Sequence, residues 1–272
     1  MNVMEHSVSK MERAFDELLR REDYLVTQAN ELARSFGNLS ALEHKVLDYA
    51  FSFVQRNDEP DKVYQANIID IIRHLGLTRS GRNYTIISKA FRSLDYKTSL
   101  TISQTEADGK RSILITHLFD HVKIVEDGRI EFRFSRDVEP YVFQLKKRFY
   151  SFRLSELALV RSKYTLIMLK LWNANANGWR NYDEPGSLPP NAKITGSLDE
   201  WESWFLNTDD DGVTTHWPAG RFRQKVLDVA LKELATLYPR VSIDLEVQSY
   251  KRKTTGYTVT FTHNDPHLTA FD

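Results

Sequence analysis

Two predicted helices carry cations and amide groups on the side opposite their apolar residues. Successive residues of a helix are about 100° apart, so its apolar stripe fixes which side chains point outward. The inward residues are Tyr84, Ile87, Ala90, Phe91 and Leu94 in the first helix, and Phe222, Val226, Val229, Ala230 and Leu234 in the second. The outward residues are Arg82, Thr85, Lys89 and Arg92 in the first helix, and Arg221, Gln224, Lys225, Asp228 and Lys232 in the second.

These outward side chains have the chemistry of a surface that enters the major groove of DNA. Arg donates two hydrogen bonds to guanine and Gln pairs with adenine, whereas Lys neutralises phosphate. Recognition helices commonly read bases with their first residues, and Arg221, Gln224 and Lys225 stand near the start of their helix. Arg223 falls beside Phe222 at the edge of the core, so we rank it below these three as a candidate for base contact. A solvated amphipathic helix without a ligand has the same pattern. The elements next to each helix must therefore decide whether it binds DNA.

Positive and negative charge are segregated along a chain whose formal net charge is zero. A neutral chain at first argues against nucleic acid, because affinity for DNA comes largely from neutralised phosphates. Residues 73–97, however, hold six Lys or Arg against one Asp, and residues 140–170 hold seven against one Glu. Most of the compensating acid lies in residues 181–211, which end in the run Asp209 to Asp211. We therefore expect two basic regions, one of them around Arg79 and the first helix.

The first of these helices follows two others in the order of a helix-turn-helix. Ser40, with Glu43 three residues later, forms a capping-box pattern that predicts a helix over residues 41–55. A short helix over residues 65–75 comes next, and Thr78 or Ser80 then opens the helix that runs to about residue 94. Two helices joined by a turn with glycine are typical of the helix-turn-helix, although the pattern has many false positives.

After residue 94 the sequence changes to alternating segments rich in β-branched residues. SLTISQT and SILITHLF flank the turn formers of residues 107–110, and Asp127-Gly128 supplies a tight turn within VKIVEDGRIEFRF. Two hairpins are therefore predicted. A helix-turn-helix followed at once by a hairpin is a winged helix, so we expect the first hairpin to be the wing, with Lys110 and Arg111 against phosphates.

The second half of the chain repeats this order of elements. A basic helix is predicted over residues 154–172, and after a long loop Ser197 caps a short helix with Glu200 three residues later. Pro218 then stands in the first turn of the second long helix, which ends near residue 237. Strands VSIDLEV and GYTVTFTH follow, and the loop between them presents three cations that we expect to lie against phosphates. These are Lys251, Arg252 and Lys253.

The sequence therefore predicts an α+β fold of two tandem winged-helix domains related by weak pseudo-symmetry. The two long helices align with Ile87 on Val226 and Phe91 on Ala230, but identity is sparse and the repeat rests on element order. We expect an N-terminal extension over residues 1–24 and an N-terminal winged-helix domain over residues 25–138 for dimerisation and secondary DNA contacts. A C-terminal winged-helix domain over residues 139–272 is expected to supply the main sequence-specific DNA binding.

The sequence lacks the residues that are characteristic of several classes of protein. The chain has no Cys, which excludes thiolate zinc sites and cysteine nucleophiles, and it has no G-x-x-x-x-G-K-[ST] phosphate-binding loop. His117 and His121 are four residues apart, as are His263 and His267, but the first pair falls in predicted strands, where this spacing makes no helical ligand pair. We expect a protein that binds DNA without cofactor, ATP or metal, and that is not an enzyme.

The N-terminus lacks the apolar core of a signal peptide, and no apolar run is long enough to span a bilayer. We therefore expect a cytoplasmic protein with no membrane partner.

The sequence resembles the iteron-binding plasmid replication initiators, the Rep family with twin winged-helix domains. The resemblance covers about residues 25–263. It rests on LVTQANELARSFGNLSALEHKVL, LKKRFYSFRLSELALVRSKYTLIMLKLW, FRQKVLDVALKEL, VSIDL and GYTVTFT. The central block is the most specific and has family spacings at Leu145, Phe149, Tyr150, Leu159, Ser162 and Tyr164.

The resemblance implies an initiator of theta-type plasmid replication, bacterial and plasmid-associated. Such a protein binds direct repeats in origin DNA (iterons) as a monomer, represses its own promoter as a dimer bound to an inverted repeat, and recruits the host replication initiator and helicase. It also implies that the C-terminal recognition helix dominates specificity, here through Arg221, Gln224, Lys225 and Arg223. The N-terminal extension departs from the family pattern and leaves the mode of dimerisation open, and the acidic loop before the second recognition helix departs from it too.

Two other functions remain open at this stage. A winged-helix transcriptional repressor would use the same helices, and only the central block favours replication over it. A nicking replication enzyme would need a tyrosine nucleophile and a metal held by closely spaced histidines, which the histidine pairs do not support.

Overall fold

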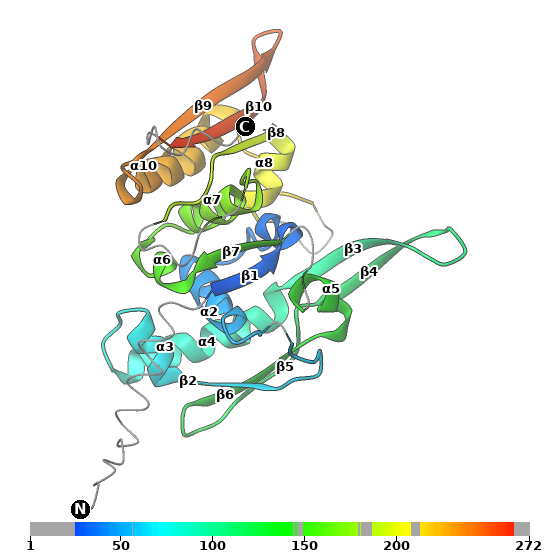
Figure 1. Ribbon diagram of the computed structural model, residues 1–272, viewed down its shortest axis with the longest axis vertical. Helices are drawn as coiled ribbons and strands as arrows, with labels where there is room; N and C mark the ends of the chain where they lie inside the picture. Colours follow the sequence, from blue (N-terminus) through cyan, green and yellow to red (C-terminus); the bar gives the residue numbers. More distant parts are fainter. Residues whose placement is uncertain are drawn as a thin grey trace, which may run out of the picture.

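The computed structural model describes residues 25–55, 57–143, 145, 149–178, 180, 187–207 and 213–263. Two groups of helices, each with its own antiparallel sheet, lie at opposite ends of an elongated molecule, and a long hairpin projects from one side (Figure 1). The N-terminal extension, the basic run of residues 146–148 and the acidic run Asp209 to Asp211 lie outside the described residues.

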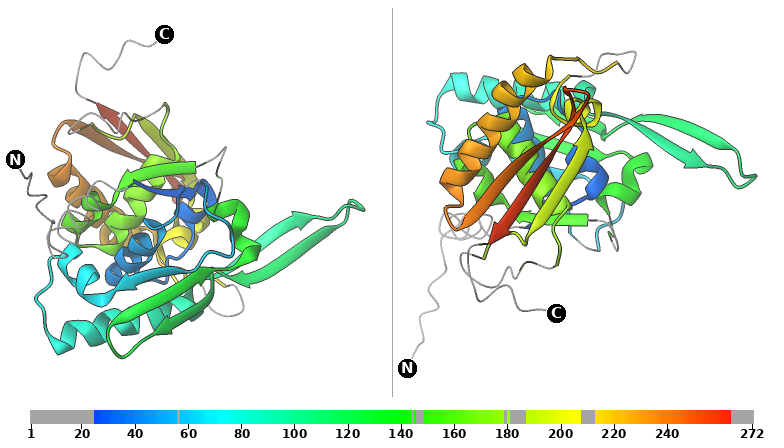
Figure 2. Two further views of the ribbon diagram at one scale, coloured as in Figure 1. Left: turned by 60° about the horizontal axis from the view of Figure 1, so that its bottom comes forward. Right: turned by 90° about the horizontal axis from the view of Figure 1, so that it is seen from above.

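The first module consists of three helices and a three-stranded sheet. Its helices are α2 (Ala41–Phe51), α3 (Ile68–His74) and α4 (Gly81–Lys97). The sheet has the order β2-β6-β5 and is formed by β2 (Tyr64–Asn67), β5 (Phe119–Ile124) and β6 (Arg129–Phe134). A separate hairpin is inserted between α4 and β5 and projects from the body (Figure 2). Its strands are β3 (Ser99–Thr105) and β4 (Arg111–His117).

The second module has the same order of elements. Its helices are α7 (Lys163–Ala174), α8 (Leu198–Phe205) and a long helix made of α9 (Ala219–Phe222), the π-helical turn η3 (Arg223–Leu227) and α10 (Asp228–Leu237). Its sheet has the order β8-β10-β9, from β8 (Ala192–Ser197), β9 (Val241–Tyr250) and β10 (Lys253–His263). Each module runs helix, strand, two helices and hairpin, so the prediction of an α+β fold with two related winged-helix domains is confirmed.

This repeat corrects the sequence-based assignment of the first wing. In both sheets the last strand lies in the middle, between the strand that follows the first helix and the strand that comes directly before it in the chain. The counterpart of the β9–β10 hairpin is therefore β5–β6. The β3–β4 hairpin, with Lys110 and Arg111, has no counterpart in the second module, so it is not the wing.

A layer of short elements connects the two modules. It contains β1 (Leu25–Ala29), η1 (Asn30–Arg34), η2 (Arg136–Val138), α5 (Glu139–Val142), β7 (Phe149–Arg153) and α6 (Leu154–Leu159). β1 pairs antiparallel with β7 (Figure 1), so this small sheet joins strands from either side of residue 138. The domain division at that residue stays a prediction.

Helix starts and turns follow the local signals in the sequence. The Ser40 hydroxyl accepts a hydrogen bond from the Glu43 backbone N–H at 3.3 Å, and the Glu43 carboxylate accepts one from the Ser40 backbone N–H at 2.7 Å. Ser197 and Glu200 form the same reciprocal pair at α8. Gly128 closes the turn before β6 with φ 90°, which glycine adopts without steric cost.

Four expected boundaries are wrong. The helix expected over residues 41–55 already ends at Phe51. The helix expected over residues 65–75 begins only at Ile68, because residues 64–67 pair with β6 as a strand. The helix expected over residues 154–172 is two helices, because Val160 is extended with ψ 134° and Ser162 caps the second. The loop expected over residues 249–255 is a two-residue turn between β9 and β10.

The core continues across both modules through α7. Trp172 of α7 stacks on Phe261 of β10 with ring centroids 4.3 Å apart. On another side of the helix, Lys170 Nζ lies 2.7 Å from Asp48 Oδ1 of α2, and both side chains are buried. Within the described residues, no helix is long and apolar enough to cross a membrane.

Candidate nucleic-acid interface

The outer face of α4 presents the side chains that the apolar stripe predicted. Ile87, Ala90, Phe91 and Leu94 are buried and Tyr84 is half-buried. Arg79, Arg82, Thr85, Lys89 and Arg92 are exposed. Ser80 caps the helix by accepting a hydrogen bond from the Asn83 backbone N–H at 3.3 Å. The predicted orientation of α4 is therefore confirmed, and its cations face solvent.

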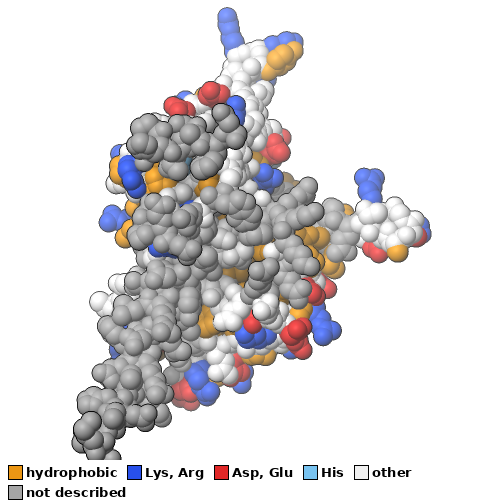
Figure 3. All heavy atoms as spheres, in the orientation of Figure 1, with side chains coloured by type: hydrophobic (Ala, Val, Ile, Leu, Met, Phe, Trp, Pro, Cys, Tyr) orange, Lys and Arg blue, Asp and Glu red, His pale blue; other side chains and the backbone are white. Residues whose placement is uncertain are grey.

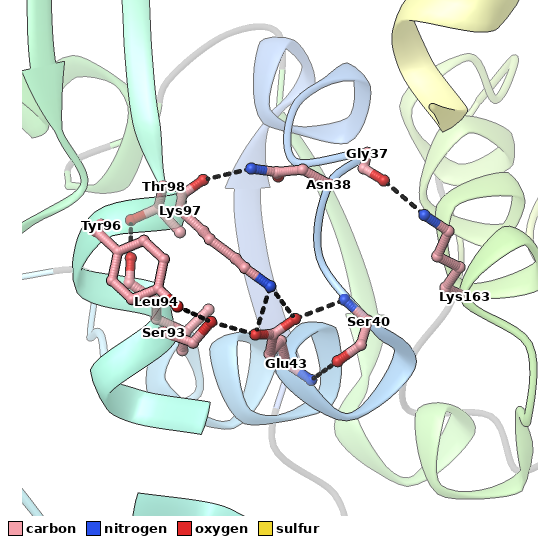
Figure 4. A network of polar contacts seen from close by, with 10 residues as sticks. All are labelled: Gly37, Asn38, Ser40, Glu43, Ser93, Leu94, Tyr96, Lys97, Thr98 and Lys163. Carbon is pink, nitrogen blue, oxygen red and sulfur yellow. Dashed lines mark hydrogen bonds and ion pairs between the residues drawn. The ribbon is translucent and has the colours of Figure 1, made fainter. Parts of the chain in front are cut away.

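A carboxylate of α2 fixes α4 in place. Glu43 accepts hydrogen bonds from Lys97 Nζ at 2.9 Å and from the Ser93 hydroxyl, while also closing its own capping box at Ser40 (Figure 4). Burial raises the pKa of Glu43, but the hydrogen bonds from Ser40, Ser93 and Lys97 outweigh it and lower the pKa to about 2. The group is therefore ionised at neutral pH and binds the two helices together through a charged contact.

The α2–α4 junction is hollowed on its solvent side. A pocket of about 720 Å³ is lined by Leu42 of α2 and Ile86 of α4, with Lys89, Arg92 and Lys97 among the other lining residues. Glu43 also lines this pocket and is paired with Lys97, which leaves Lys89 and Arg92 as the cations of the wall without a partner among the described residues.

The long helix α9–η3–α10, which the sequence predicts as the second recognition helix, differs from a regular α-helix in one turn. The π-helical turn η3 adds a residue to that turn and rotates everything after it. Leu227 is consequently buried, while Val229, expected in the core, is 41% exposed, so that expectation is wrong. Arg223 is exposed rather than at the core edge, and its Nε lies 3.5 Å from Asp228 Oδ1.

The predicted base-reading residues stand together at the start of this helix. Arg221, Gln224 and Lys225 are all exposed, and Lys232 is exposed further along. Phe222 is buried between them. Its ring meets Phe205 edge to face and stacks on Tyr257, so it anchors the helix start to α8 and β10. The structure thus brings the three donors into one surface. Whether they contact DNA stays a prediction.

Residues just before α9 hold this surface in place, and sequence reasoning missed them. Glu202 of α8 is buried, and it accepts a hydrogen bond from the Trp217 backbone N–H at 2.8 Å. Its other oxygen lies 2.7 Å from His216 Nδ1. Trp217 in turn makes a cation–π contact with Arg221, whose Cζ lies 4.5 Å from the indole ring centroid. The one signal in the sequence that could have indicated this role is a tryptophan directly before Pro218 and a basic helix.

One group of possible metal ligands lies at the same place. In the described part of the chain, ligand atoms of Asp199, Glu202 and His216 lie within 4.8 Å of one another. The contact of His216 with Glu202 and the hydrogen bond from Trp217 account for the arrangement without an ion.

The basic hairpin residues lie at the ends of two projections. Lys110 and Arg111 stand at the tip of β3–β4, where Lys110 Nζ contacts Asp108 Oδ2 at 2.7 Å. Lys251, Arg252 and Lys253 are exposed at the tip of β9–β10. Figure 3 shows Lys and Arg side chains at both tips.

One solved structure shares this fold, and two others show a weaker likeness. A crystal structure of the Pi initiator protein in complex with iteron DNA has 17% sequence identity and a TM-score of 0.67, covering 89% of this chain and 98% of that chain. The WH1 domain of MSBI1.176, a replication protein isolated from a multiple sclerosis patient, has 16% identity and a TM-score of 0.35 over 53% of this chain and 98% of its own. Domains 2 and 3 of RctB have 12% identity and a TM-score of 0.42, over 88% of this chain and 86% of theirs.

No curated protein matches the sequence. A family model described as initiator replication protein, WH1, matches residues 25–173, which is more than half of the chain. This match covers α2, α3 and α4, the connecting layer, and α7 up to Asn173. The chain therefore belongs to the initiator replication protein family.

Proposed function

We propose that this protein starts theta-type replication of a bacterial plasmid by binding directly repeated sites, or iterons, in double-stranded origin DNA. The observation that carries the proposal is the exposed group of Arg221, Gln224 and Lys225 at the start of the second recognition helix. Membership of the initiator family supports it, and so does the fold shared with the Pi initiator, which was crystallised with iteron DNA.

The two modules divide the work in this proposal. The C-terminal domain, residues 139–272, reads bases through Arg221, Gln224, Lys225 and Arg223. The N-terminal domain, residues 25–138, adds phosphate contacts through the exposed cations of α4. Lys110 and Arg111 on the projecting hairpin, and Lys251, Arg252 and Lys253 on the second wing, extend the positive surface along the duplex.

The protein also binds itself in this proposal, as a monomer on direct repeats and as a dimer on an inverted repeat at its own promoter, which it represses. Ile113 and Ile115 on β4 are 68% and 71% exposed, so the projecting hairpin offers an apolar face for self-association. Sedimentation of the free protein, with stoichiometry measured on single and inverted sites, tests this. An obligate higher oligomer in both measurements would contradict it.

We further propose that the protein acts in the cytoplasm, without cofactor and without cutting DNA, and that it recruits the host replication initiator and helicase. Binding by winged helices needs no covalent step. Incubation of the pure protein with supercoiled origin plasmid is expected to leave the plasmid intact. Reproducible nicking that a tyrosine substitution abolishes would contradict this part.

Footprinting on DNA that flanks the encoding gene tests the main proposal. Protection of several direct repeats is the expected result. Protection of a lone inverted repeat, with no direct repeats protected, would instead identify a winged-helix transcriptional repressor.

A further inference from the structure

The pocket between α2 and α4 has an apolar side that a phosphate group does not use. Leu42 of α2 and Ile86 of α4 are half-buried in its wall, and Tyr96, near the end of α4, is 62% exposed. Glu43 and Lys97 also line the pocket and are paired with each other (Figure 4). Phosphate contacts need cations and hydrogen-bond donors, so these apolar side chains indicate a ligand with an apolar part.

The solvent side of this pocket is cationic. Residues of a helix are about 100° apart, which places Lys89 and Arg92 on the outer side of Ile86. Both cations are exposed, and within the described residues neither is paired with a carboxylate. The pocket therefore suits a segment that carries apolar side chains next to acidic ones.

The first 24 residues of the chain have that pattern in their sequence. They lie outside the described residues, and their periodicity predicts an amphipathic helix. The apolar residues recur at alternating spacings of four and three, so they form one narrow stripe. They are Met4, Val8, Met11, Phe15 and Leu18.

The acids of this segment fall on one flank of the stripe. At about 100° per residue, four carboxylates share a sector of about 40° beside it. They are Glu5, Glu12, Asp16 and Asp23. Lys10 and Arg21 fall on the opposite flank. The segment thus has an apolar stripe with negative charge along one side, complementary to an apolar pocket with Lys89 and Arg92 along one side.

The segment joins the described structure close to the helix that lines the pocket. Leu25 opens β1, and Gln28 of this strand donates a hydrogen bond from Nε2 to Asp48 Oδ1 of α2 at 3.0 Å. A helix of 24 residues spans about 36 Å, whereas the 11 residues of α2 span about 17 Å. The segment is therefore long enough to lie along the pocket.

We propose that residues 1–24 dock as a helix in the pocket between α2 and α4 of the same chain. The apolar stripe packs against Leu42 and Ile86, and the acidic flank pairs with Lys89 and Arg92. The docked segment occupies cations that α4 offers to phosphate, so it competes with DNA for the first module. The docking is independent of the proposed function, whereas the competition rests on it.

Zero-length cross-linking of the full chain tests the docking. A carbodiimide joins a carboxylate to a lysine amine only where the two are in contact, and Lys123 with Glu131, 3.0 Å apart, is the positive control. In the monomer, mass spectrometry is expected to find Lys89 linked to Glu12 or Asp16. Excess duplex of unrelated sequence is expected to remove this link and to leave the control link. A linked control pair with no link from Lys89 to residues 1–24, or with such a link only in cross-linked dimers, would overturn the inference.

Binding of full-length variants to the same unrelated duplex tests the competition. Phe15→Asp adds a negative charge, which by itself weakens binding to DNA. It is nevertheless expected to bind about threefold more tightly than the wild type, because apparent affinity scales with the fraction of protein whose site is free. His6→Asp, on the opposite face of the segment, adds the same charge and is expected to bind no more tightly than the wild type.

The outcomes separate this inference from the proposed function. If Phe15→Asp binds no more tightly than His6→Asp, the competition is disproved. A wild type that shows the link from Lys89 to residues 1–24 but binds neither this duplex nor origin DNA would overturn the proposed function and leave the docking in place.

Discussion

The guanidinium of Arg221 lies over the indole ring of Trp217, with Cζ 4.5 Å from the ring centroid. Trp217 is held by the buried carboxylate of Glu202, which accepts its backbone N–H. A side chain whose position is set in the free protein loses less conformational freedom on binding. Arg221 is therefore oriented in advance by a residue that precedes its helix.

We predict that Trp217→Ala weakens binding to the specific site by roughly two- to fivefold, because an exposed cation–π contact contributes about 0.5–1 kcal/mol. Titration of the labelled site with each variant measures it, with Val229→Ala on the same helix as the control. Trp217→Ala and Arg221→Ala should not be additive. Full additivity would show that the two residues act separately.

The two recognition helices are predicted to differ in what their substitutions change. Arg221→Ala or Gln224→Ala should alter base preference at particular positions, since a bidentate contact discriminates by about 1–3 kcal/mol. Arg82→Ala, Lys89→Ala or Arg92→Ala should weaken binding to all sequences alike and reduce the salt slope by about one. Binding to single-base variants of the site at several salt concentrations measures both effects. A profile reshaped by Arg82→Ala and untouched by Arg221→Ala would reverse the assignment.

The buried pair of Lys170 and Asp48 should matter for stability. Its atoms lie 2.7 Å apart, and the side chains are 4% and 0% exposed. Removing one partner leaves an uncompensated buried charge, so Asp48→Ala should lower the free energy of unfolding by about 3–5 kcal/mol. Lys123→Ala, which breaks an exposed pair with Glu131, should cost about 1 kcal/mol or less. Urea denaturation compares the two, and equal losses would disprove the prediction.

Glu43 should contribute to the loss of stability in acid. Its pKa falls from an ordinary 4.5 to about 2 in the folded protein. A depressed carboxyl pKa stabilises the fold above the unfolded value, and this contribution is lost as pH falls from about 4.5 toward about 2. Glu43→Gln should therefore flatten the dependence of unfolding free energy on pH across that window. An unchanged slope would mean that the contacts to Lys97 and Ser93 do not persist in solution.

Local signals in the sequence were enough to predict features that depend only on residues within a few positions of one another. Ser40 with Glu43 and Ser197 with Glu200 mark helix starts that depend only on residues three apart, and Asp127-Gly128 fixes its turn in the same way. The outward face of α4 was also predictable, because that helix is regular from its Ser80 cap onward.

Features that depend on distant partners were not predictable. β1 forms only because β7, more than a hundred residues later, pairs with it, and neither segment has a strong alternating pattern of its own. The inserted residue of η3 moved Val229 outward and Leu227 inward, and no rule of helical spacing announces a π-helical turn. The first wing was misassigned for a related reason, since the order β2-β6-β5 appears only when the sheet is assembled.

The most direct test of the account is replication itself. A plasmid whose only origin is the DNA that flanks this gene is introduced into cells that supply either the wild-type protein or Arg221→Ala/Gln224→Ala at equal, folded levels. The account predicts stable transformants with the wild type and at least a hundredfold fewer with the double variant, with Val229→Ala behaving as the wild type. Equal numbers of transformants with the double variant would contradict it.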